Sequence, residues 1–279
     1  FHIKSMSGYN IKSSAFKEAG IINDLWIIES IDDLNSLPDE YVVLGAGSNS
    51  LIDPSIKKTI IKVSPSFYEF ECKDNILVCS AGATVSSTLK WLSKNNYSGL
   101  EFAAGVPATI GGMVFMNFEC WGYEISKMVH SVQIYSKENG IEWINRSDYE
   151  IAYRWSSFHK WECVILAVKL HVTPSDSETI KKELKENIDY RKEKQPLYKY
   201  TFGSVFKNPL PEKAGQLIDQ AGLKGLVIGG AKVSEHHANF IENINSATFD
   251  DTIALIKKIQ EIINKKNNID LECEVQIIY

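Results

Sequence analysis

The sequence predicts an α+β protein, and three observations support this fold class. Short runs rich in Val and Ile recur between turn residues through the first two thirds of the chain. Helical patterns are few in that part and more frequent toward the C-terminus. Hydrophobic residues make up 44% and charged residues 23% of the 279 residues, as in ordinary globular proteins with a substantial core. We therefore expect a strand-rich front part followed by a compact α+β part.

Five runs are typical of β-strands because they are rich in Val and Ile and are bounded by turn residues. They are YVVL at 41–44, TIIKV at 59–63, NILVCS at 75–80, SVQIYS at 131–136 and ECVILAVKLHV at 162–172. A sixth strand is expected in LECEVQII at 271–278, where polar and apolar residues alternate and Glu272 and Glu274 share one face.

Four segments show the helical spacing of apolar residues. Thr84 is expected to begin the first helix, and Thr248 the last, in a capping box with Asp251. The second helix should end near Arg191, just before a Gln-Pro pair. The third, KAGQLIDQAG at 213–222, ends at a glycine suited to a C-cap.

Charge and cysteine usage exclude several classes of protein. The formal net charge of −5 makes nucleic acid and anionic membranes poor partners. No apolar run has the length of a membrane span, and the first residues lack the apolar core of a signal peptide. The five cysteines are scattered without a C-x-x-C pair, and His236 and His237 are adjacent, so their side chains point apart. We expect a cytoplasmic protein without a metal site.

The segment GAGSN follows a predicted strand and comprises Gly45, Ala46, Gly47, Ser48 and Asn49. Its small residues allow positive φ and expose consecutive N–H groups, which suits a phosphate. It opens no helix in the manner of a dinucleotide fingerprint, so a plain hairpin turn is an equal alternative.

A second glycine cluster lies in GVPATIGGMVFMN at 105–117, where Gly105, Gly111 and Gly112 flank a proline and Thr109. Here too the backbone can approach a ligand closely. Together the two clusters favour a diphosphate-bearing cofactor, and tight turns at the corners of a sheet are the alternative.

Three polar residues stand in unusual surroundings. Arg154 lies between aromatic residues in EIAYRWSSF, where a guanidinium is costly to desolvate without an anion. Ser204 lies in YTFGSVFKNP, which lacks the context of an acyl-transfer serine. Glu274 lies on the predicted terminal strand. An exposed loop arginine, a turn serine and a solvated strand face are the simpler interpretations.

Seven motifs follow one another in an order that resembles a known family. They are LGAGSNSLI, AGVPATIGGMVFMN, YRWSSF, GSVFKNP, AGQLIDQAGLKG, IGGAKVSEHHANFIEN and LECEV. From about Tyr41 to its end, the sequence resembles the bacterial UDP-N-acetylenolpyruvoylglucosamine reductases (MurB), in their shorter subclass.

The resemblance implies an FAD-binding fold of the vanillyl-alcohol-oxidase (PCMH) type, in two α+β subdomains, followed by a C-terminal α+β substrate domain. The implied bounds are 1–62 and 63–190 for the subdomains and 191–279 for the substrate domain. By matching of motifs, the FAD contacts are Gly45, Ala46, Gly47, Ser48, Asn49, Thr109, Gly111 and Gly112. Asn208 and His237 match positions that bind the nucleotide sugar.

The resemblance also implies a reaction with two halves, which belongs to peptidoglycan precursor synthesis and so to cell-wall biogenesis, cell shape and division. NADPH reduces FAD, and hydride then passes from flavin N5 to C3 of the enolpyruvyl group of UDP-N-acetylglucosamine enolpyruvate. Arg154, Ser204 and Glu274 match the three catalytic positions. Arg154 and Glu274 would stabilise charge on the substrate carboxylate, and Ser204 would donate the proton to C2. Another FAD-dependent oxidoreductase of the same superfamily and a non-catalytic flavin-binding protein are the alternatives.

The chain departs from the family pattern at three places. Ala46 stands where a glycine is frequent, which should be tolerated if its φ is negative. NFECWG at 117–122 replaces smaller residues, so the flavin surroundings should differ. SGYNIKSSAF at 7–16 lacks the usual threonine-rich stretch, so the first FAD contacts are not predicted.

Overall fold

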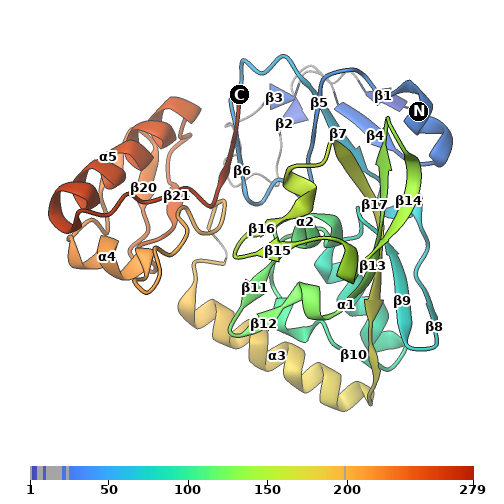
Figure 1. Cartoon of the computed structure of the whole chain (residues 1–279). Coiled ribbons are helices and arrows are strands. Elements are labelled where there is room, and N and C mark those ends of the chain that lie inside the picture. Colours follow the sequence, from blue (N-terminus) through green and yellow to red (C-terminus); the bar gives the residue numbers. More distant parts are fainter. Residues whose placement is uncertain (1, 5–8, 11–20, 23–24, 198) are drawn as a thin grey trace. The chain divides into compact units, whose positions relative to one another are not determined.

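The computed structural model of the chain (Figure 1) describes residues 2–4, 9–10, 21–22, 25–197 and 199–279. These residues divide into two compact units. Of the described residues, unit 1 contains 2–4, 25–46 and 58–190, and unit 2 contains 9–10, 21–22, 47–57, 191–197 and 199–279. The segment 45–49 therefore crosses from unit 1 to unit 2 between Ala46 and Gly47.

Unit 1 contains a four-stranded sheet of order β1-β4-β7-β5, in which β1 is antiparallel to β4 and the other pairs are parallel. Its strands are β1 (His2–Lys4), β4 (Leu25–Ile28), β7 (Thr59–Val63) and β5 (Tyr41–Val43). Strand β7 lies in the interior of this sheet, and Ile60 and Ile61 on its two faces are fully buried. The apolar run of TIIKV is thus explained by cover on both faces.

The second large sheet of unit 1 has five antiparallel strands in the order β14-β13-β17-β9-β8 (Figure 1). Its strands are β14 (Gly140–Asn145), β13 (Val129–Ser136), β17 (Cys163–His171), β9 (Ile76–Ser80) and β8 (Glu71–Lys73). The central strand β17 is buried continuously from Val164 to Val168, because helix α2 packs against it and the core covers both faces.

Two helices and three short strand pairs also lie in the described part of unit 1, together with the 3-10 helices Ile31–Ser36, Pro65–Phe67, Glu101–Ala103, Ile125–Lys127, Arg146–Asp148 and Ser157–His159. Helix α1 (Val85–Lys94) begins as predicted, since the Thr84 hydroxyl accepts a hydrogen bond from Ser87 N–H. Helix α2 (Ile110–Phe115) has Thr109 as its N-cap. The strand pairs are β10 (Tyr97–Ser98) with β18 (Thr173–Pro174), β11 (Glu119–Cys120) with β12 (Tyr123–Glu124), and β15 (Ile151–Ala152) with β16 (Trp155–Ser156).

Helix α3 (Ser177–Lys194) begins in unit 1 and ends in unit 2. The prediction that it ends near Arg191 was short by three residues. The helix continues because Glu193 and Lys194 are good helix formers, and it stops before Pro196, which restricts Gln195.

Unit 2 has its own core, built from the antiparallel sheet β19-β20-β21 and the helices α4 and α5 that pack with it (Figure 1). These elements are β19 (Val227–Ile228), β20 (Ala231–Val233), β21 (Ile241–Asn243), α4 (Ala214–Gln220) and α5 (Phe249–Asn267). Two further strand pairs are β2 (Tyr9–Asn10) with β3 (Ile21–Ile22) and β6 (Ser50–Ile52) with β22 (Gln276–Ile278).

The ends of the unit 2 helices agree with the sequence patterns. Thr248 and Asp251 form the predicted capping box of α5, with the Thr248 hydroxyl accepting from Asp251 N–H at 3.0 Å. Gly222 follows α4 with a φ of +72°, which favours glycine. The terminal strand is shorter than predicted: β22 begins at Gln276, and Cys273 makes only an isolated bridge with Phe206.

None of the helices in the described residues combines the length and the apolar composition that crossing a lipid bilayer requires.

Candidate functional site

In unit 1 the first residue of GAGSN lies against the second glycine cluster. A Cβ atom added to Gly45 would lie 2.7 Å from Thr109 Oγ1 and 3.7 Å from the Gly112 Cα atom. The Thr109 hydroxyl is fixed, because it accepts the N–H of Gly112 at 3.2 Å as the N-cap of α2. Only a glycine at position 45 allows this approach, so the structure brings together three of the predicted cofactor contacts.

A third segment, SAGAT at 80–84, lies beside the same cluster and was missed by the sequence analysis. Gly111 N–H donates to Ala81 O and Ile110 N–H donates to Ala83 O, both at 2.9 Å. A Cβ on Gly111 would lie 2.8 Å from the Ala81 Cβ. Gly111 is buried against this segment and Gly112 is half-buried. The small residues in both segments could have indicated this close contact from the sequence.

The strand pairing excludes the hairpin alternative for GAGSN. The strand before this segment, β5, pairs with β7, and the strand after it, β6, pairs with β22. The loop therefore joins strands of two different sheets. The corner-turn alternative fails for residues 110–115 of the second cluster, because these residues form α2.

The backbone of the loop is compatible with its residues. Gly47 has a φ of +75°, which favours glycine, whereas Ala46 lies outside the left-handed region. The condition on which Ala46 was expected to be tolerated is thus met. With Gly45, Ala46 and Gly47 the loop carries no side chain larger than a methyl group at these positions, which is the composition of a phosphate-binding loop.

Asn117, at the end of the second cluster, offers a further polar atom. Its Nδ2 donates to Glu124 Oε1 at 2.9 Å and to Ala152 O at 3.0 Å. Its Oδ1 is buried and accepts no hydrogen bond from the described residues. A buried acceptor without a donor is costly in an empty fold, so this atom suits a bound molecule that donates a hydrogen bond. The residues of unit 1 thus fit a bound dinucleotide cofactor.

Arg154 lies at the turn of the β15–β16 hairpin, with a φ of +55° that is uncommon for a residue with a side chain. Its guanidinium donates to Glu119 O at 3.0 Å and lies 5.0 Å from the Tyr153 ring centroid. The hairpin is also held by Ser156, whose hydroxyl donates to Phe115 O at 2.6 Å. The aromatic surroundings predicted for Arg154 are present, since its guanidinium lies 5.0 Å from the Tyr153 ring centroid and 6.0 Å from that of Phe118.

Ser204 and Glu274 lie on neighbouring main-chain segments of unit 2. The Glu274 N–H donates to Val205 O at 2.8 Å, which places Glu274 beside the residue that follows Ser204. Gly203, with a φ of +74°, precedes the serine. The Ser204 side chain is half-buried, and its hydroxyl has no hydrogen-bond partner among the described residues of this unit. This hydroxyl is therefore available to a ligand.

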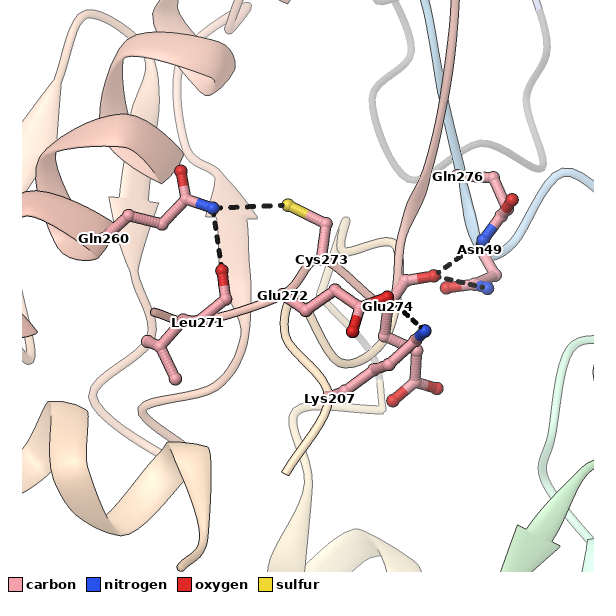
Figure 2. A network of polar contacts seen from close by, with 8 residues as sticks. All are labelled: Asn49, Lys207, Gln260, Leu271, Glu272, Cys273, Glu274 and Gln276. Atoms are coloured by element: carbon pink, nitrogen blue, oxygen red, sulfur yellow. Dashed lines mark hydrogen bonds and ion pairs between the residues drawn. The ribbon is translucent and has the colours of Figure 1, made fainter. Parts of the chain in front are cut away.

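The Glu274 segment is tied to the second half of GAGSN (Figure 2). The Glu274 carbonyl accepts hydrogen bonds from Asn49 Nδ2 at 3.3 Å and from Gln276 Nε2 at 3.2 Å. The Gln276 N–H donates to Asn49 O at 2.9 Å. Hydrogen bonds thus link the segments of unit 2 that contain three predicted site residues, Asn49, Ser204 and Glu274.

The neighbours of Glu274 in the segment 271–273 make structural contacts. Lys207 pairs with Glu272, and Gln260 from α5 donates to Leu271 O at 2.9 Å (Figure 2). Burial raises the pKa of the Cys273 thiol, with a smaller contribution from the charge of Glu272. The thiol is thus protonated at neutral pH and is a poor nucleophile.

Asn208 and His237 both lie at the start of α4. Asn208 Oδ1 accepts from Ala214 N–H at 3.0 Å. A Cβ on Gly215 would lie 2.9 Å from His237 Cε1, so the ring packs closely on the helix. Burial lowers the pKa of His237, and the neighbouring charge of His236 lowers it further. His237 is therefore neutral at pH 7 and can serve as a hydrogen-bonding group.

Several predictions of the site remain untested by the geometry. Arg154 belongs to unit 1, whereas Ser204 and Glu274 belong to unit 2, so their convergence stays a prediction. The same holds for the division of residues 1–190 into two subdomains. Most of the segment 7–16 lies outside the described residues. In the described part of the chain, no three His, Cys, Asp or Glu side chains cluster in a way that could hold a metal ion.

Comparison with known proteins defines the class of the protein. Residues 27–144 match the family model of an FAD binding domain, and residues 195–278 match the C-terminal domain of UDP-N-acetylenolpyruvoylglucosamine reductase. The crystal structure of the Thermus caldophilus enzyme (MurB) superposes with a TM-score of 0.87 at 27% identity over 100% of both chains. The chain is an FAD-dependent oxidoreductase with the predicted α+β fold class, which is confirmed.

Relatives in sequence identify the family. The UDP-N-acetylenolpyruvoylglucosamine reductase of Bacillus pumilus is 38% identical, over 91% of this chain and 88% of the relative. That of Bacillus subtilis is 36% identical, over 95% of this chain and 90% of the relative. The chain belongs to the UDP-N-acetylenolpyruvoylglucosamine reductase family, as its motifs predicted.

Proposed function

We propose that this protein reduces the enolpyruvyl group of UDP-N-acetylglucosamine enolpyruvate to give UDP-N-acetylmuramate, a precursor of peptidoglycan, with NADPH as reductant. The observation that carries the proposal is that an FAD binding domain and the C-terminal domain particular to this reductase family match the chain in that order. Identity of 36–38% over at least 91% of the chain supports the same activity.

The two alternatives are not favoured. Another oxidoreductase that shared only the FAD binding domain would have no reason to carry the reductase-type C-terminal domain, which matches 84 of the last 85 residues. A flavin-binding protein without turnover would have no need for that domain either, nor for its half-buried Ser204 hydroxyl.

FAD would be held by the small-residue segments described above, namely Gly45 to Asn49 with Thr109, Gly111 and Gly112. The close contact between Gly45 and Thr109 and the unpaired Asn117 Oδ1 support this assignment. When bound, the flavin supplies the hydride that NADPH has delivered to its N5 atom, for addition to C3 of the enolpyruvyl group.

Reduction of a carbon–carbon double bond by hydride at C3 leaves negative charge at C2 and in the adjacent carboxylate. We assign Arg154 to this carboxylate, since a planar guanidinium matches its two oxygens. Its hydrogen bond to Glu119 O and its neighbouring rings fix the guanidinium, which supports the role because a preorganised charge stabilises the transition state more than a mobile one. Glu274 would assist as a hydrogen-bond donor in its protonated form.

Ser204 would donate the proton that completes the reaction at C2. Its hydroxyl is half-buried and makes no hydrogen bond within the described part of unit 2, so no internal acceptor competes for the proton. The O–H bond breaks as the new C–H bond forms, and the alkoxide recovers a proton from solvent. Asn208 and His237 would contact the nucleotide sugar.

We also propose a cytoplasmic location and no nucleic-acid or membrane partner. The five cysteines are free thiols, and the formal net charge is −5. Both properties support an intracellular enzyme of small molecules.

An anaerobic titration tests the proposed function. The FAD-loaded protein should lose its yellow colour on addition of NADPH, and the colour should return with the enolpyruvyl nucleotide and without oxygen. Recovery of the colour only with oxygen would favour another oxidoreductase. Failure of NADPH to bleach the flavin would favour a protein without turnover.

A further inference from the structure

Asn239 is a buried residue of unit 2, 4% exposed, in the connection between β20 and β21. Its amide makes two hydrogen bonds to one residue: Oδ1 accepts from Phe206 N–H at 3.0 Å, and Nδ2 donates to Phe206 O at 2.9 Å. Its main-chain carbonyl accepts from Val205 N–H at 2.9 Å. Three hydrogen bonds therefore connect Asn239 to the two residues that follow Ser204.

The opposite edge of the same segment faces the chain from Glu272 to Glu274. Val205 O accepts from Glu274 N–H at 2.8 Å, and Lys207 N–H donates to Glu272 O at 2.9 Å. Phe206 lies opposite Cys273 in an isolated antiparallel bridge, and the N–H and C=O of Phe206 point away from Cys273. The Asn239 amide takes the place of a neighbouring strand on this second side.

An asparagine is the residue type that this position requires. Its amide has an acceptor and a donor spaced like those of a peptide group, so both polar groups of Phe206 are satisfied. Phe206 is 1% exposed, so its N–H and C=O would otherwise be buried without partners. An aspartate would set a second acceptor against Phe206 O, and an alanine would leave both groups unpaired.

The arrangement has a specific consequence for Ser204. The serine lies between Gly203, whose backbone is permissive, and a segment held from both sides. The main chain on the C-terminal side of Ser204 is thus held by hydrogen bonds on both edges. Glu274, in contrast, keeps its bonds to Asn49 and Gln276 whether or not Asn239 is present. Loss of the Asn239 amide should displace the serine more than the glutamate.

We propose that Asn239 is a positioning residue, which holds the Ser204 hydroxyl in place for proton donation through the main chain of Phe206. The proposal rests on the proposed function, since it concerns the half-reaction in which Ser204 acts. A displacement of about 1 Å of a reacting group can lower a rate about 100-fold. The half-reaction in which NADPH reduces the flavin does not involve Ser204 and should be unaffected.

Stopped-flow measurement of the two half-reactions tests the proposal in the FAD-loaded enzyme. For Asn239→Ala we expect flavin reduction by NADPH within about twofold of the wild-type rate, and reoxidation by the enolpyruvyl nucleotide slower by about 100-fold. Asn239→Ser, which keeps one hydroxyl near Phe206, should lie between. Asn243→Ala is the matched control: it loses one side-chain bond, to Ala247 N–H at 2.9 Å, and keeps the main-chain bond of its N–H to Tyr200 O.

A double-mutant cycle with Ser204→Ala separates positioning from a general structural role. If Asn239 acts through Ser204, Asn239→Ala should cause no further loss of reoxidation rate once the hydroxyl is absent. An equal loss in both backgrounds, or a parallel loss in both half-reactions, would overturn the proposal. The proposal would also be overturned if both Asn239 variants failed to bind FAD and failed to unfold cooperatively, because the role of Asn239 would then lie in folding.

The cycle also distinguishes this proposal from the proposed function. If Ser204→Ala alone leaves reoxidation unchanged, the assignment of the proton donor is wrong. If Ser204→Ala slows reoxidation as expected and the Asn239 variants do not, only the positioning role is wrong.

Discussion

Substitution of Gly45 by alanine tests whether the contact between the two glycine clusters matters for FAD binding. The new Cβ would lie 2.7 Å from Thr109 Oγ1, about 0.7 Å closer than the roughly 3.4 Å of an ordinary contact. Gly45 lies outside the left-handed region, so alanine brings no backbone strain, and the whole effect is steric. Thr109 cannot turn aside without giving up its bond to Gly112 N–H.

The magnitude follows from these two costs. Forcing a methyl group into a packed site costs about 1–3 kcal/mol, and loss of a threonine N-cap costs about 1 kcal/mol. The loop should relax by whichever of the two responses costs less free energy. We therefore expect the free energy of FAD binding to weaken by about 1–2 kcal/mol. Because these residues belong to the proposed diphosphate site, the dissociation constant of FAD should rise roughly 10-fold.

Titration of the apoprotein with FAD, followed by the change in flavin fluorescence, measures this constant. The control is Thr109→Ala with and without Gly45→Ala. With the hydroxyl gone the steric conflict is absent, so the double variant should bind FAD as Thr109→Ala does. An unchanged dissociation constant for Gly45→Ala would refute the reasoning, and so would purely additive effects in the double variant.

Two further predictions concern unit 2. Thr248→Ala removes the N-cap of α5, so the free energy of unfolding should fall by about 1 kcal/mol in chemical denaturation, and an unchanged midpoint would contradict the capping role. Burial holds the pKa of His237 below its usual 6.5, so the unfolded chain binds a proton first as the pH falls. Wild-type stability should therefore decline below about pH 6.5, by at most roughly 1.4 kcal/mol per pH unit from this group, and His237→Gln should show a shallower decline. Equal slopes for the two proteins would contradict the burial of a neutral imidazole.

Local patterns predicted the elements whose formation depends on nearby residues. Thr84 and Thr248 cap helices because an N-cap bond reaches only three residues along the chain. TIIKV at 59–63 forms a strand because its β-branched residues suit an interior strand covered on both faces. In these cases the residues that determine the element lie within a few positions of one another in the sequence.

Features that depend on distant partners were not predicted. The Asn239 amide binds Phe206, 33 residues earlier in the chain, and nothing near either residue signals this contact. The approach of Gly111 to Ala81 likewise joins two segments that lie far apart in sequence. The predicted strand at 271–278 is interrupted because its partners change, from Phe206 at Cys273 to the strand β6 at Gln276. Such contacts follow from tertiary packing.

For the candidate site, too, some features could be predicted from the sequence and others only from the structure. The motifs containing Arg154, Ser204 and Glu274 could be found only through resemblance to a family, because each residue alone has a simpler interpretation. The structure adds the framework that joins Ser204 to Glu274 within unit 2. That neighbouring relation had no signature in the local sequence.

The role of Ser204 is the central claim, and the two half-reactions of Ser204→Ala test it most directly. Stopped-flow absorbance of the bound flavin would be followed with NADPH and then, anaerobically, with the enolpyruvyl nucleotide. We predict reduction at the wild-type rate and reoxidation slower by about 10²-fold to 10⁴-fold, the usual contribution of a general acid. Reoxidation at the wild-type rate, or an equal loss in both half-reactions, would contradict the claim that this hydroxyl supplies the proton.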